Sequence, residues 1–340
     1  APLEAKNLDP QERLVLEEAY NCIAEAGYTP STLSPKNNVG VYIGVSNATY
    51  ATGAHFASIA NRIAYTFNFF GPSMAIDSAC SSSLTAIHLA LESLYLGTSD
   101  SALAGGVNLI LDPIHFISLS KMTMLSQGPK CKAFAADADG FVAGEGVGVV
   151  LLKRLCDAQQ ANDHIHGVIK GSMINSGGKT NGYTVPNPVA QSRVIEQAMV
   201  RAGVAPETIS YIEAHGTGTV LGDPIEIAGL SKPYRSDVAE HQYCAIGSVK
   251  SNIGHCESAA GVAGLTKILL QFKHQLIVPS LHADAVNPEI DFEHSPFYIQ
   301  QETTHWSSPY SKKRTAGLSS FGAGGSNAHL IVEEYLAPPL

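Results

Sequence analysis

The sequence lacks three features, each of which would indicate a particular class of protein. Its apolar runs are short and broken by glycine, so none could span a bilayer as a helix. Positive charge is scarce, with 21 lysines and arginines against 30 aspartates and glutamates, a net charge of −9. That balance argues against binding to nucleic acid or to an anionic membrane. The six cysteines form no C-x-x-C pair, which disfavours disulfides and structural zinc and predicts a protein of the reducing cytoplasm.

What is present is an alternation of apolar strand-like runs with helical segments. The first set of strands is predicted at Val39–Val45, Ser73–Asp77, Ala102–Leu109 and Gly146–Lys153. The second set is predicted at His166–Met173, Ile209–Ala214, Ala245–Val249 and Ala328–Glu333. Helices are predicted after Cys80 through Leu96, and at Ala190–Ala202 and Ala259–Lys273. Continuous apolar strands between helices indicate sheets buried on both faces, and therefore an α/β fold.

The first helix should begin after Asp9, with Glu12 completing a capping box and Gly27 ending the helix. A weak internal repeat relates Phe141-Val142-Ala143-Gly144 to Phe321-Gly322-Ala323-Gly324, at an offset of 321 − 141 = 180 residues. In both places a glycine-rich stretch leads into a strand. Two related halves would account for this repeat, and chance similarity of glycine-rich turns is the alternative.

Cys80 lies where a predicted strand runs into a predicted helix, in Asp77-Ser78-Ala79-Cys80-Ser81-Ser82-Ser83. The first N–H groups of a helix and its dipole favour a thiolate over a thiol, and the small neighbours leave room for a substrate. This arrangement is typical of an activated nucleophile. The alternative is a cysteine packed as a small apolar side chain.

Two histidines also follow predicted strands. His215 stands in Glu213-Ala214-His215-Gly216-Thr217-Gly218-Thr219, and His255 in Lys250-Ser251-Asn252-Ile253-Gly254-His255. A single histidine is most often structural, but two at strand ends together with Cys80 indicate a catalytic site, because functional groups in α/β folds gather outside strand ends. Asp112, Asp223 and Glu226 show no metal-ligand spacing with them. The stretch Gly322–Asn327 is a weak match to a dinucleotide-binding loop, and no clear strand precedes it.

Taken together, the motifs D-x-A-C-S-S-S, E-A-H-G-T-G-T and K-S-N-I-G-H resemble those of β-ketoacyl synthases, in the same order. Leu221–Glu226 and Ser319–His329 extend the resemblance, which covers essentially the whole chain. It is strongest to ketosynthase domains of modular polyketide synthases. Gly177–Pro188 resembles the subgroup whose acyltransferase is a separate protein.

The resemblance implies a thiolase-like fold, five layers α/β/α/β/α in two pseudo-symmetric halves. The halves would be residues 1–160, carrying the nucleophilic cysteine, and 161–340, carrying the two histidines. It also implies a homodimer. Similar domains begin before the point that corresponds to Leu8–Arg13, so we expect the sequence to be incomplete at its N-terminus.

For the chemistry, the resemblance implies that Cys80 takes up an acyl chain, and that His215 and His255 stabilise the enolate formed from a malonyl group. The backbone N–H groups of Cys80 and Ala323 would form the oxyanion hole. Lys250 and Glu257 would orient the histidines. Substrate would be bound by Thr217, Thr219 and Phe321. The domain would bind no cofactor and no metal, and its substrates would arrive on the phosphopantetheine of acyl carrier proteins.

One departure from the family pattern is Ala323, where fatty-acid relatives often carry a gating phenylalanine; the smaller residue predicts a roomier acyl entrance. Another is Ala135, where relatives often have aspartate. Alternatives remain at this stage. A condensation-incompetent relative would transfer or gate acyl chains, and a docking module would not need Cys80. A thiolase or a cysteine hydrolase is disfavoured, since Cys256 lies outside a thiolase context and the histidines have no evident acidic partner.

Overall fold

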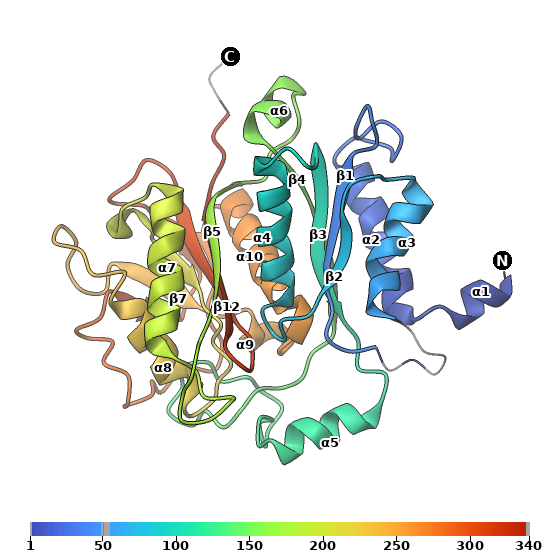
Figure 1. Cartoon of the computed structure of the whole chain (residues 1–340). Coiled ribbons are helices and arrows are strands. Elements are labelled where there is room, and N and C mark those ends of the chain that lie inside the picture. The colour runs from blue at the N-terminus through green and yellow to red at the C-terminus, as the bar shows by residue number, and fades with distance from the viewer. Residues whose placement is uncertain (1, 49, 51–54, 338–340) are drawn as a thin grey trace. The chain divides into compact units, whose positions relative to one another are not determined.

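The computed structural model describes residues 2–48, 50 and 55–337 (Figure 1). The chain divides into two compact units. The first unit comprises Ala1–His115, Gly144–Ile165 and Cys256–Val262. The second comprises Phe116–Ala143, His166–His255 and Ala263–Leu340. Each unit therefore draws on segments that are distant in sequence.

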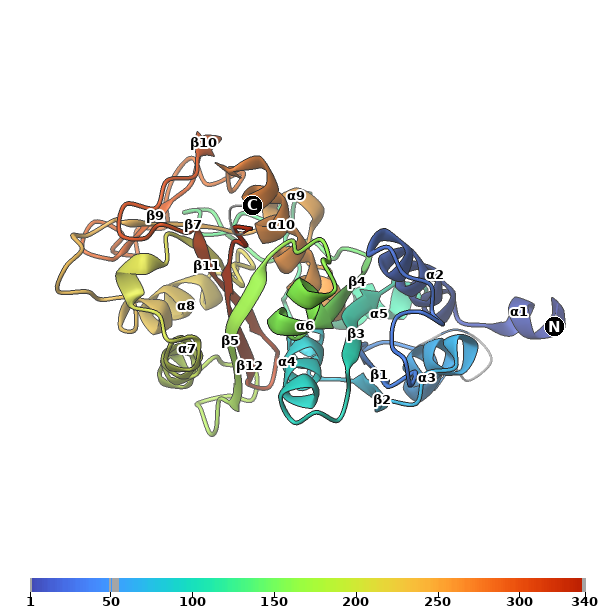
Figure 2. The same cartoon turned by 90° about the horizontal axis from the view of Figure 1, so that it is seen from above.

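A four-stranded sheet in the order β2–β1–β3–β4 forms the centre of the first unit (Figure 2). Within this sheet the adjacent strands β2, β1 and β3 run parallel, and β4 runs antiparallel to β3. The strands are β1 (Val39–Gly44), β2 (Ser73–Ile76), β3 (Ser101–Asn108) and β4 (Gly146–Lys153). Because β1 and β3 are buried along their whole length, the sheet is covered on both faces, as the continuous apolar runs predict.

Helices cover the two faces of this sheet. Helix α4 (Ser82–Tyr95) packs on β1 and β3, while α2 (Pro10–Glu25) packs on β4 and α3 (Phe56–Phe67) packs on β2. In both views α4 lies on one side of the sheet and the pair α2 and α3 on the other (Figures 1 and 2). The unit also contains α1 (Pro2–Asn7), α6 (Leu155–Gln160) and the 3₁₀ turn η2 (Glu257–Ala259).

Two of the three features predicted for the ends of α2 are confirmed. The Asp9 side chain accepts a hydrogen bond of 2.8 Å from the Gln11 N–H, and Gly27 has a left-handed φ of 82° just beyond the helix. The predicted capping box is wrong, because Glu12 instead accepts hydrogen bonds from Arg62 and Ser58 of α3. Glu12 thus ties two helices together.

A six-stranded sheet in the order β5–β12–β11–β6–β7–β9 forms the centre of the second unit. Strands β11, β6, β7 and β9 are parallel, and β12 pairs antiparallel with both β11 and β5. The strands are β5 (Val168–Ser176), β6 (Tyr211–Glu213), β7 (Cys244–Gly247), β9 (Phe297–Ile299), β11 (Thr315–Phe321) and β12 (Ser326–Glu333). A separate pair is formed by β8 (Leu276–Ile277) and β10 (Thr304–His305).

The two faces of the six-stranded sheet bury different side chains. On one face Ile212 of β6 joins the apolar cluster of Val194 and Leu230, which belong to α7 (Pro188–Ala202) and α8 (Gly222–Ser231). The neighbouring residue Glu213 points to the other face, where it meets Lys267 of α10 (Ala260–His274). The remaining elements are α5 (Pro113–Lys121), α9 (Lys250–Ile253) and the 3₁₀ turn η1 (Pro206–Thr208).

The two sheets share one topology, which accounts for the internal repeat. In the first, β2, β1 and β3 are parallel neighbours and β4 closes the series antiparallel. In the second, β7, β6 and β11 are parallel neighbours and β12 closes the series antiparallel. The helix that follows β2 is α4, and the long helix that follows β7 is α10. The division into 1–160 and 161–340 stays a prediction.

All eight predicted strands occur, with ends that shift by up to three residues. The predicted helices after Cys80 and at Ala190–Ala202 and Ala259–Lys273 are confirmed as α4, α7 and α10. The interpretation that no strand precedes Gly322 is wrong, because β11 ends at Phe321. Every residue of β11 is buried, yet its Thr-Ala-Gly-Leu-Ser-Ser sequence has too few branched or aromatic side chains to look like a strand.

Candidate active site

Cys80 lies in the first unit, on the turn between β2 and α4, and is partly buried. It immediately precedes Ser81, the N-cap residue of α4. The preceding residue Ala79 has a left-handed φ of 54°, a conformation that costs a non-glycine residue about 1 kcal/mol or more. Such strain persists only where the surroundings hold it, and it fixes the thiol at the beginning of the helix.

Hydrogen bonds on both sides brace the turn of Cys80. The Asp77 carboxylate accepts from the Ala79 N–H at 3.0 Å, and the Ser82 hydroxyl donates to the Ala79 carbonyl at 2.6 Å. The Ser82 hydroxyl also accepts from the Ser78 N–H at 3.0 Å. The serines and the aspartate around Cys80 in the sequence motif therefore serve to hold its unusual backbone.

The two predicted histidines are brought together in the second unit. His215 lies on the loop that follows β6, and His255 lies beyond the short helix α9. Their ring centroids are 5.4 Å apart and the rings are nearly perpendicular, at 82°. Phe141 packs its ring edge-on to His255 at 4.9 Å, and Phe321 lies 5.8 Å from His215. The aromatic rings fix the orientation of both imidazoles.

Both imidazoles are held neutral. Burial lowers the pKa of His215 well below its usual value, and the nearby positive charge of Lys250 lowers that pKa further. Burial and Lys250 likewise lower the pKa of His255. Lys250 itself is buried at the beginning of α9, with 4% of its surface exposed. Neutral imidazoles can each donate one N–H to a developing negative charge without first taking up a proton.

Two carboxylates that the sequence analysis left without a role hold the His215 loop. Glu226 accepts hydrogen bonds from the backbone N–H groups of His215 and Gly216, at 2.7 and 2.8 Å. Asp223 accepts from the N–H of Gly218 at 3.1 Å and from that of Phe134 at 2.7 Å. Burial raises the pKa of Asp223 to about 6 and that of Glu226 to about 7.

The predicted substrate-binding residues, and Ala323 of the predicted oxyanion hole, lie on two turns of the second unit. Thr217 and Thr219 have their hydroxyl oxygens 3.2 Å apart on the His215 loop. Phe321 is buried at the end of β11, and Ala323 is exposed on the turn into β12. This turn contains two successive left-handed glycines, Gly324 and Gly325, both at φ 92°. Their conformation turns the backbone tightly beside Ala323.

Glu257 and Lys250 fall in different units, and the structure adds His115 to the predicted residues. In the first unit the Glu257 carboxylate lies 2.6 Å from His115 Nε2 and accepts from the Asn47 amide at 3.5 Å. Glu257 has a left-handed φ of 43°. No local pattern indicates this contact, because 142 residues separate the two partners. The orienting roles of Glu257 and Lys250 stay predictions.

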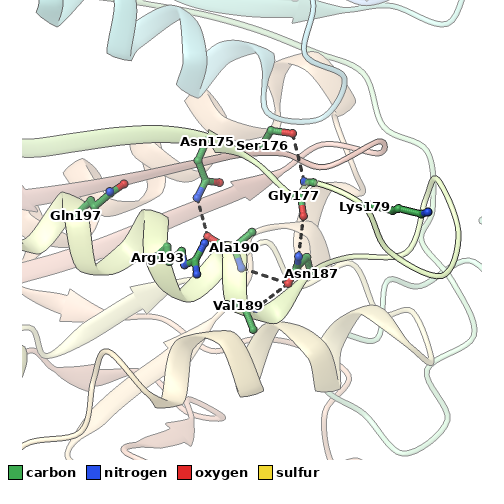
Figure 3. A pocket seen from close by; sticks show the side chains of 10 residues that line it. Asn175, Ser176, Gly177, Lys179, Asn187, Val189, Ala190, Arg193 and Gln197 are labelled. Carbon is green, nitrogen blue, oxygen red and sulfur yellow. Dashed lines mark hydrogen bonds between the residues drawn. The ribbon is translucent and has the colours of Figure 1, made fainter.

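A cavity of about 460 Å³ lies between the loop after β5 and the beginning of α7 (Figure 3). Its described lining contains the amides of Asn175, Asn187 and Gln197 and the basic side chains of Lys179 and Arg193, but no cysteine, histidine or carboxylate. The Gly177 N–H donates to the Gly325 carbonyl at 2.7 Å, so this loop is fastened to the turn that contains Ala323. The loop therefore supports that turn, and the described lining of the cavity contains none of the residues predicted for the catalytic site.

Within the described ranges, no group of three or more histidine, cysteine, aspartate and glutamate side chains is arranged to hold a metal ion. None of the helices seen in residues 2–48, 50 and 55–337 has the length and apolar character needed to cross a membrane.

In the first unit a thiol stands on a strained strand-to-helix turn, and in the second unit two neutral imidazoles lie together, His255 buried and His215 partly buried. Each feature is typical of condensing acyltransferases. Two family models match the chain, "Beta-ketoacyl synthase, N-terminal domain" over residues 1–158 and "Beta-ketoacyl synthase, C-terminal domain" over residues 166–284. The chain belongs to the β-ketoacyl synthase family. Ketosynthases of this family transfer acyl groups and carry no cofactor of their own.

The chain is similar to segments of large polyketide synthases. It is 63% identical to polyketide synthase PksM of Bacillus subtilis, across 99% of this chain and 8% of that protein. To polyketide synthase ThaG of Burkholderia thailandensis it is 52% identical, across 98% of this chain and 6% of that protein. The chain thus spans less than a tenth of the length of either relative.

Solved ketosynthases share the fold. The ketosynthase from module 6 of the bacillaene synthase of Bacillus subtilis superposes with a TM-score of 0.96 and 46% identity, covering 99% of this chain and 60% of that one. The oxazolomycin ketosynthase of Streptomyces albus also superposes with a TM-score of 0.96, at 44% identity, covering 100% of this chain and 62% of that one. The predicted thiolase-like fold is confirmed.

Proposed function

We propose that this chain is the ketosynthase of a modular polyketide synthase and extends a polyketide by two carbons through decarboxylative Claisen condensation. The observation that carries the proposal is the pair His215 and His255 in a member of the β-ketoacyl synthase family: their neutral rings have centroids 5.4 Å apart, with His255 buried and His215 partly buried. Two neutral N–H donors can stabilise the negative charge on an enolate oxygen, whereas a general base, which accepts a proton, would not. The relatives PksM and ThaG are named polyketide synthases, which supports the choice of product.

In the first step the Cys80 thiolate attacks the thioester carbonyl of an acyl chain on a carrier protein. The backbone N–H groups of Cys80 and Ala323 stabilise the oxyanion of the tetrahedral intermediate. The carbon–sulfur bond to phosphopantetheine then breaks, and the departing thiolate takes up a proton. The chain is left as a thioester on Cys80, so the strained turn of Ala79 serves to present the sulfur.

In the second step a malonyl group on a carrier loses carbon dioxide, and the electrons of the broken carbon–carbon bond form an enolate. His215 and His255 donate hydrogen bonds to the enolate oxygen, with Lys250 and Glu257 acting as positioning residues. The enolate carbon attacks the acyl-Cys80 carbonyl and the cysteine thiolate leaves. Thr217 and Thr219 hold the phosphopantetheine arm through their hydroxyls during both steps, and Phe321 also binds substrate.

The proposal includes partners and a location. Acyl carrier proteins deliver both substrates, and a separate acyltransferase loads the malonyl group, as in the subgroup that Gly177–Pro188 resembles. The active form is a homodimer in the cytoplasm. Support for a dimer comes from β2, which is an edge strand of the described four-stranded sheet. Around it Tyr65, Phe70 and Met74 are 84%, 71% and 40% exposed, an apolar surface beside unpaired backbone.

The test of the function is mass spectrometry of the intact protein and its peptides. The protein is incubated with an acyl-phosphopantetheine thioester and then with a malonyl-carrier protein. We expect an acyl adduct on Cys80 that disappears as a product two carbons longer forms. Cys80→Ala should give no adduct, while Cys156→Ala, which removes an exposed cysteine, should behave as the unaltered protein does.

The same experiment separates the alternatives. An adduct that persists in the presence of malonyl-carrier would indicate a domain that transfers or gates acyl chains without extending them. Absence of any adduct on the folded protein would eliminate Cys80 as the nucleophile and leave a docking role.

A further inference from the structure

A buried ion pair lies on the face of the six-stranded sheet opposite α7. The ammonium of Lys267 is 2.8 Å from Glu213 Oε2, and the two side chains are 7% and 1% exposed. Removing two such charges from water costs several kcal/mol each, so a buried pair is weak evidence for stability by itself. Stability alone therefore does not explain why these two charged side chains are buried here.

The carboxylate of Glu213 contacts three separate segments of the second unit. Its Oε2 accepts a hydrogen bond from the Tyr211 hydroxyl at 2.7 Å, in addition to the contact with Lys267. Its Oε1 accepts from the backbone N–H of Val249 at 2.6 Å. One carboxylate thus joins β6, the residue that precedes α9, and α10.

Two of these three segments, β6 and the one at Val249, lead to the histidines. Glu213 ends β6 two residues before His215. Val249 immediately precedes Lys250, and the short helix that begins there leads to His255. A shift of the Glu213 carboxylate would therefore move the two histidine loops relative to one another.

Two glycines allow the close approach that this contact needs. A Cβ atom at Gly264 of α10 would lie 3.1 Å from Glu213 Cγ and 2.8 Å from Leu318 Cδ1. At Gly247 of β7 it would lie 3.3 Å from the Tyr211 hydroxyl and 3.6 Å from Lys267 Nζ. The helix and the strand therefore close around the pair with no side chain between them.

Aromatic rings shield the pair from solvent. Tyr211 packs edge-on to Trp306 at 5.5 Å, and Trp306 stacks on Phe272 at 5.0 Å. The Lys267 ammonium also lies 5.5 Å from the centroid of the Tyr211 ring. In such surroundings an ion pair is held in one geometry more firmly than it would be in water.

We propose that Glu213 and Lys267 are positioning residues that set the spacing of the His215 and His255 loops, a role that rests on the proposed function. Neither residue needs to touch substrate. Their effect falls on the decarboxylation and condensation step, which uses the histidines, and not on the transfer of the acyl chain to Cys80.

The test compares the two steps in the same variants. Glu213→Gln keeps an acceptor for the Val249 N–H but leaves the Lys267 charge unpaired. We expect the rate of Cys80 acylation, per folded molecule, to stay within about twofold of the unaltered protein. Condensation by the acylated enzyme should fall by about 100-fold, the loss that a misplacement of about 1 Å causes.

A conservative variant and a matched control complete the design. Lys267→Arg retains the charge. If Lys267→Met loses about 100-fold in condensation rate and Lys267→Arg only about 10-fold, the arginine variant should be about ten times faster than the methionine variant. Lys313→Met breaks a more exposed ion pair of the same 2.8 Å length, with Glu333, and should change neither step.

The outcomes distinguish this proposal from the function on which it rests. If the unaltered protein does not condense, the proposed function fails. If it condenses and Glu213→Gln slows both steps equally, or neither, the positioning role is overturned. Should Glu213→Gln and Lys267→Met not fold, the comparison is made with Lys267→Arg, whose equal effect on both steps would overturn the proposal as well.

Discussion

In the proposed mechanism His215 and His255 act as neutral donors because the protein encloses them, and this has a consequence for the pH dependence of condensation. The pKa of each is lowered in the fold, so neither ring takes up a proton as the pH falls through the value usual for a histidine, about 6.5. We expect single-turnover condensation by acylated enzyme to show no loss centred near pH 6.5. Rates measured from pH 8 to pH 6 in Glu226→Gln test this, because the variant removes the neighbouring carboxyl whose pKa burial raises to about 7. A halving near pH 6.5 in that variant would contradict neutral enclosure.

His329 shows the same physics in a residue outside the site. Burial lowers its pKa to about 3, and its Nδ1 lies 3.0 Å from the Ser319 hydroxyl. The unfolded chain binds a proton below about pH 6.5 while the folded protein does not, so stability is lost as the pH falls from 6.5 towards 3. Replacing His329 by Met should reduce the loss of unfolding free energy between pH 6.5 and 5 by about 2 kcal/mol.

Urea denaturation of the two proteins at several pH values measures this difference. Many other groups titrate in this range, but they are common to both proteins and cancel in the comparison. Parallel curves would show that His329 does not contribute.

Ala323 is the residue at which this chain departs from relatives that have a gating phenylalanine. It is exposed on the turn between β11 and β12, and a Cβ atom at the next residue, Gly324, would lie 2.7 Å from the Tyr183 hydroxyl. We expect Ala323→Phe to slow loading of branched acyl chains onto Cys80 more than loading of straight ones. Competition between the two kinds of thioester, read by mass spectrometry, decides; equal slowing would argue against a gate.

Among the elements, α7 depends on a single side chain at its beginning. The side-chain Oδ1 of Asn187 accepts from the N–H groups of Val189 and Ala190, at 3.0 and 3.3 Å. Its amide nitrogen donates to the Gly177 carbonyl at 2.6 Å, which fastens the loop that lines the cavity in Figure 3. Asn187 thus combines a helix cap with a loop contact.

We expect Asn187→Ala to lower the free energy of unfolding by about 2 kcal/mol, the sum of a lost cap and a lost loop hydrogen bond. Asn187→Asp should lose about half of that, because the carboxylate still caps the helix but cannot donate to Gly177. Thermal or urea denaturation provides the measurement. An aspartate variant as unstable as the alanine variant would refute the division into two contributions.

The elements were predictable where one local property dominated. Strands β1, β3 and β4 have continuous apolar sequences, and α7 and α10 have apolar residues at helical spacing, so each was found to within a few residues. Strand β11 was missed because its burial on both faces comes from its neighbours in the sheet and not from its own small residues. The predicted capping box failed because Arg62, 50 residues away, binds Glu12.

The same distinction applies to the site. Cys80, His215 and His255 stand in distinctive local motifs, and the structure places each at a strand or helix end. The contacts of Glu226 with the His215 loop and of Glu257 with His115 join residues that are 11 and 142 positions apart. No periodicity or motif spacing reports such pairs; the fold creates them.

For the molecule as a whole, the exposed edge of β2 predicts association. We expect the protein to sediment as a dimer and Met74→Lys to shift it towards a monomer, because a charge on the edge strand opposes pairing with a second copy. Tyr95→Lys changes another exposed aromatic residue of the same unit, 65% exposed, and should leave the dimer intact. A monomeric unaltered protein, or a dimer that survives Met74→Lys, would place the interface elsewhere.

The shared strand order of the two sheets also bears on how such an enzyme can diversify. In each sheet two neighbouring parallel strands, β1 and β2 in one and β6 and β7 in the other, end at a loop that can present a reactive side chain. Three of these four places lead to Cys80, His215 and His255, while the fourth, after β1, leads to Ser46 and Asn47. A mutation can therefore change the side chain at one of these positions while both sheets keep their structure, and a new reaction can arise from a single substitution.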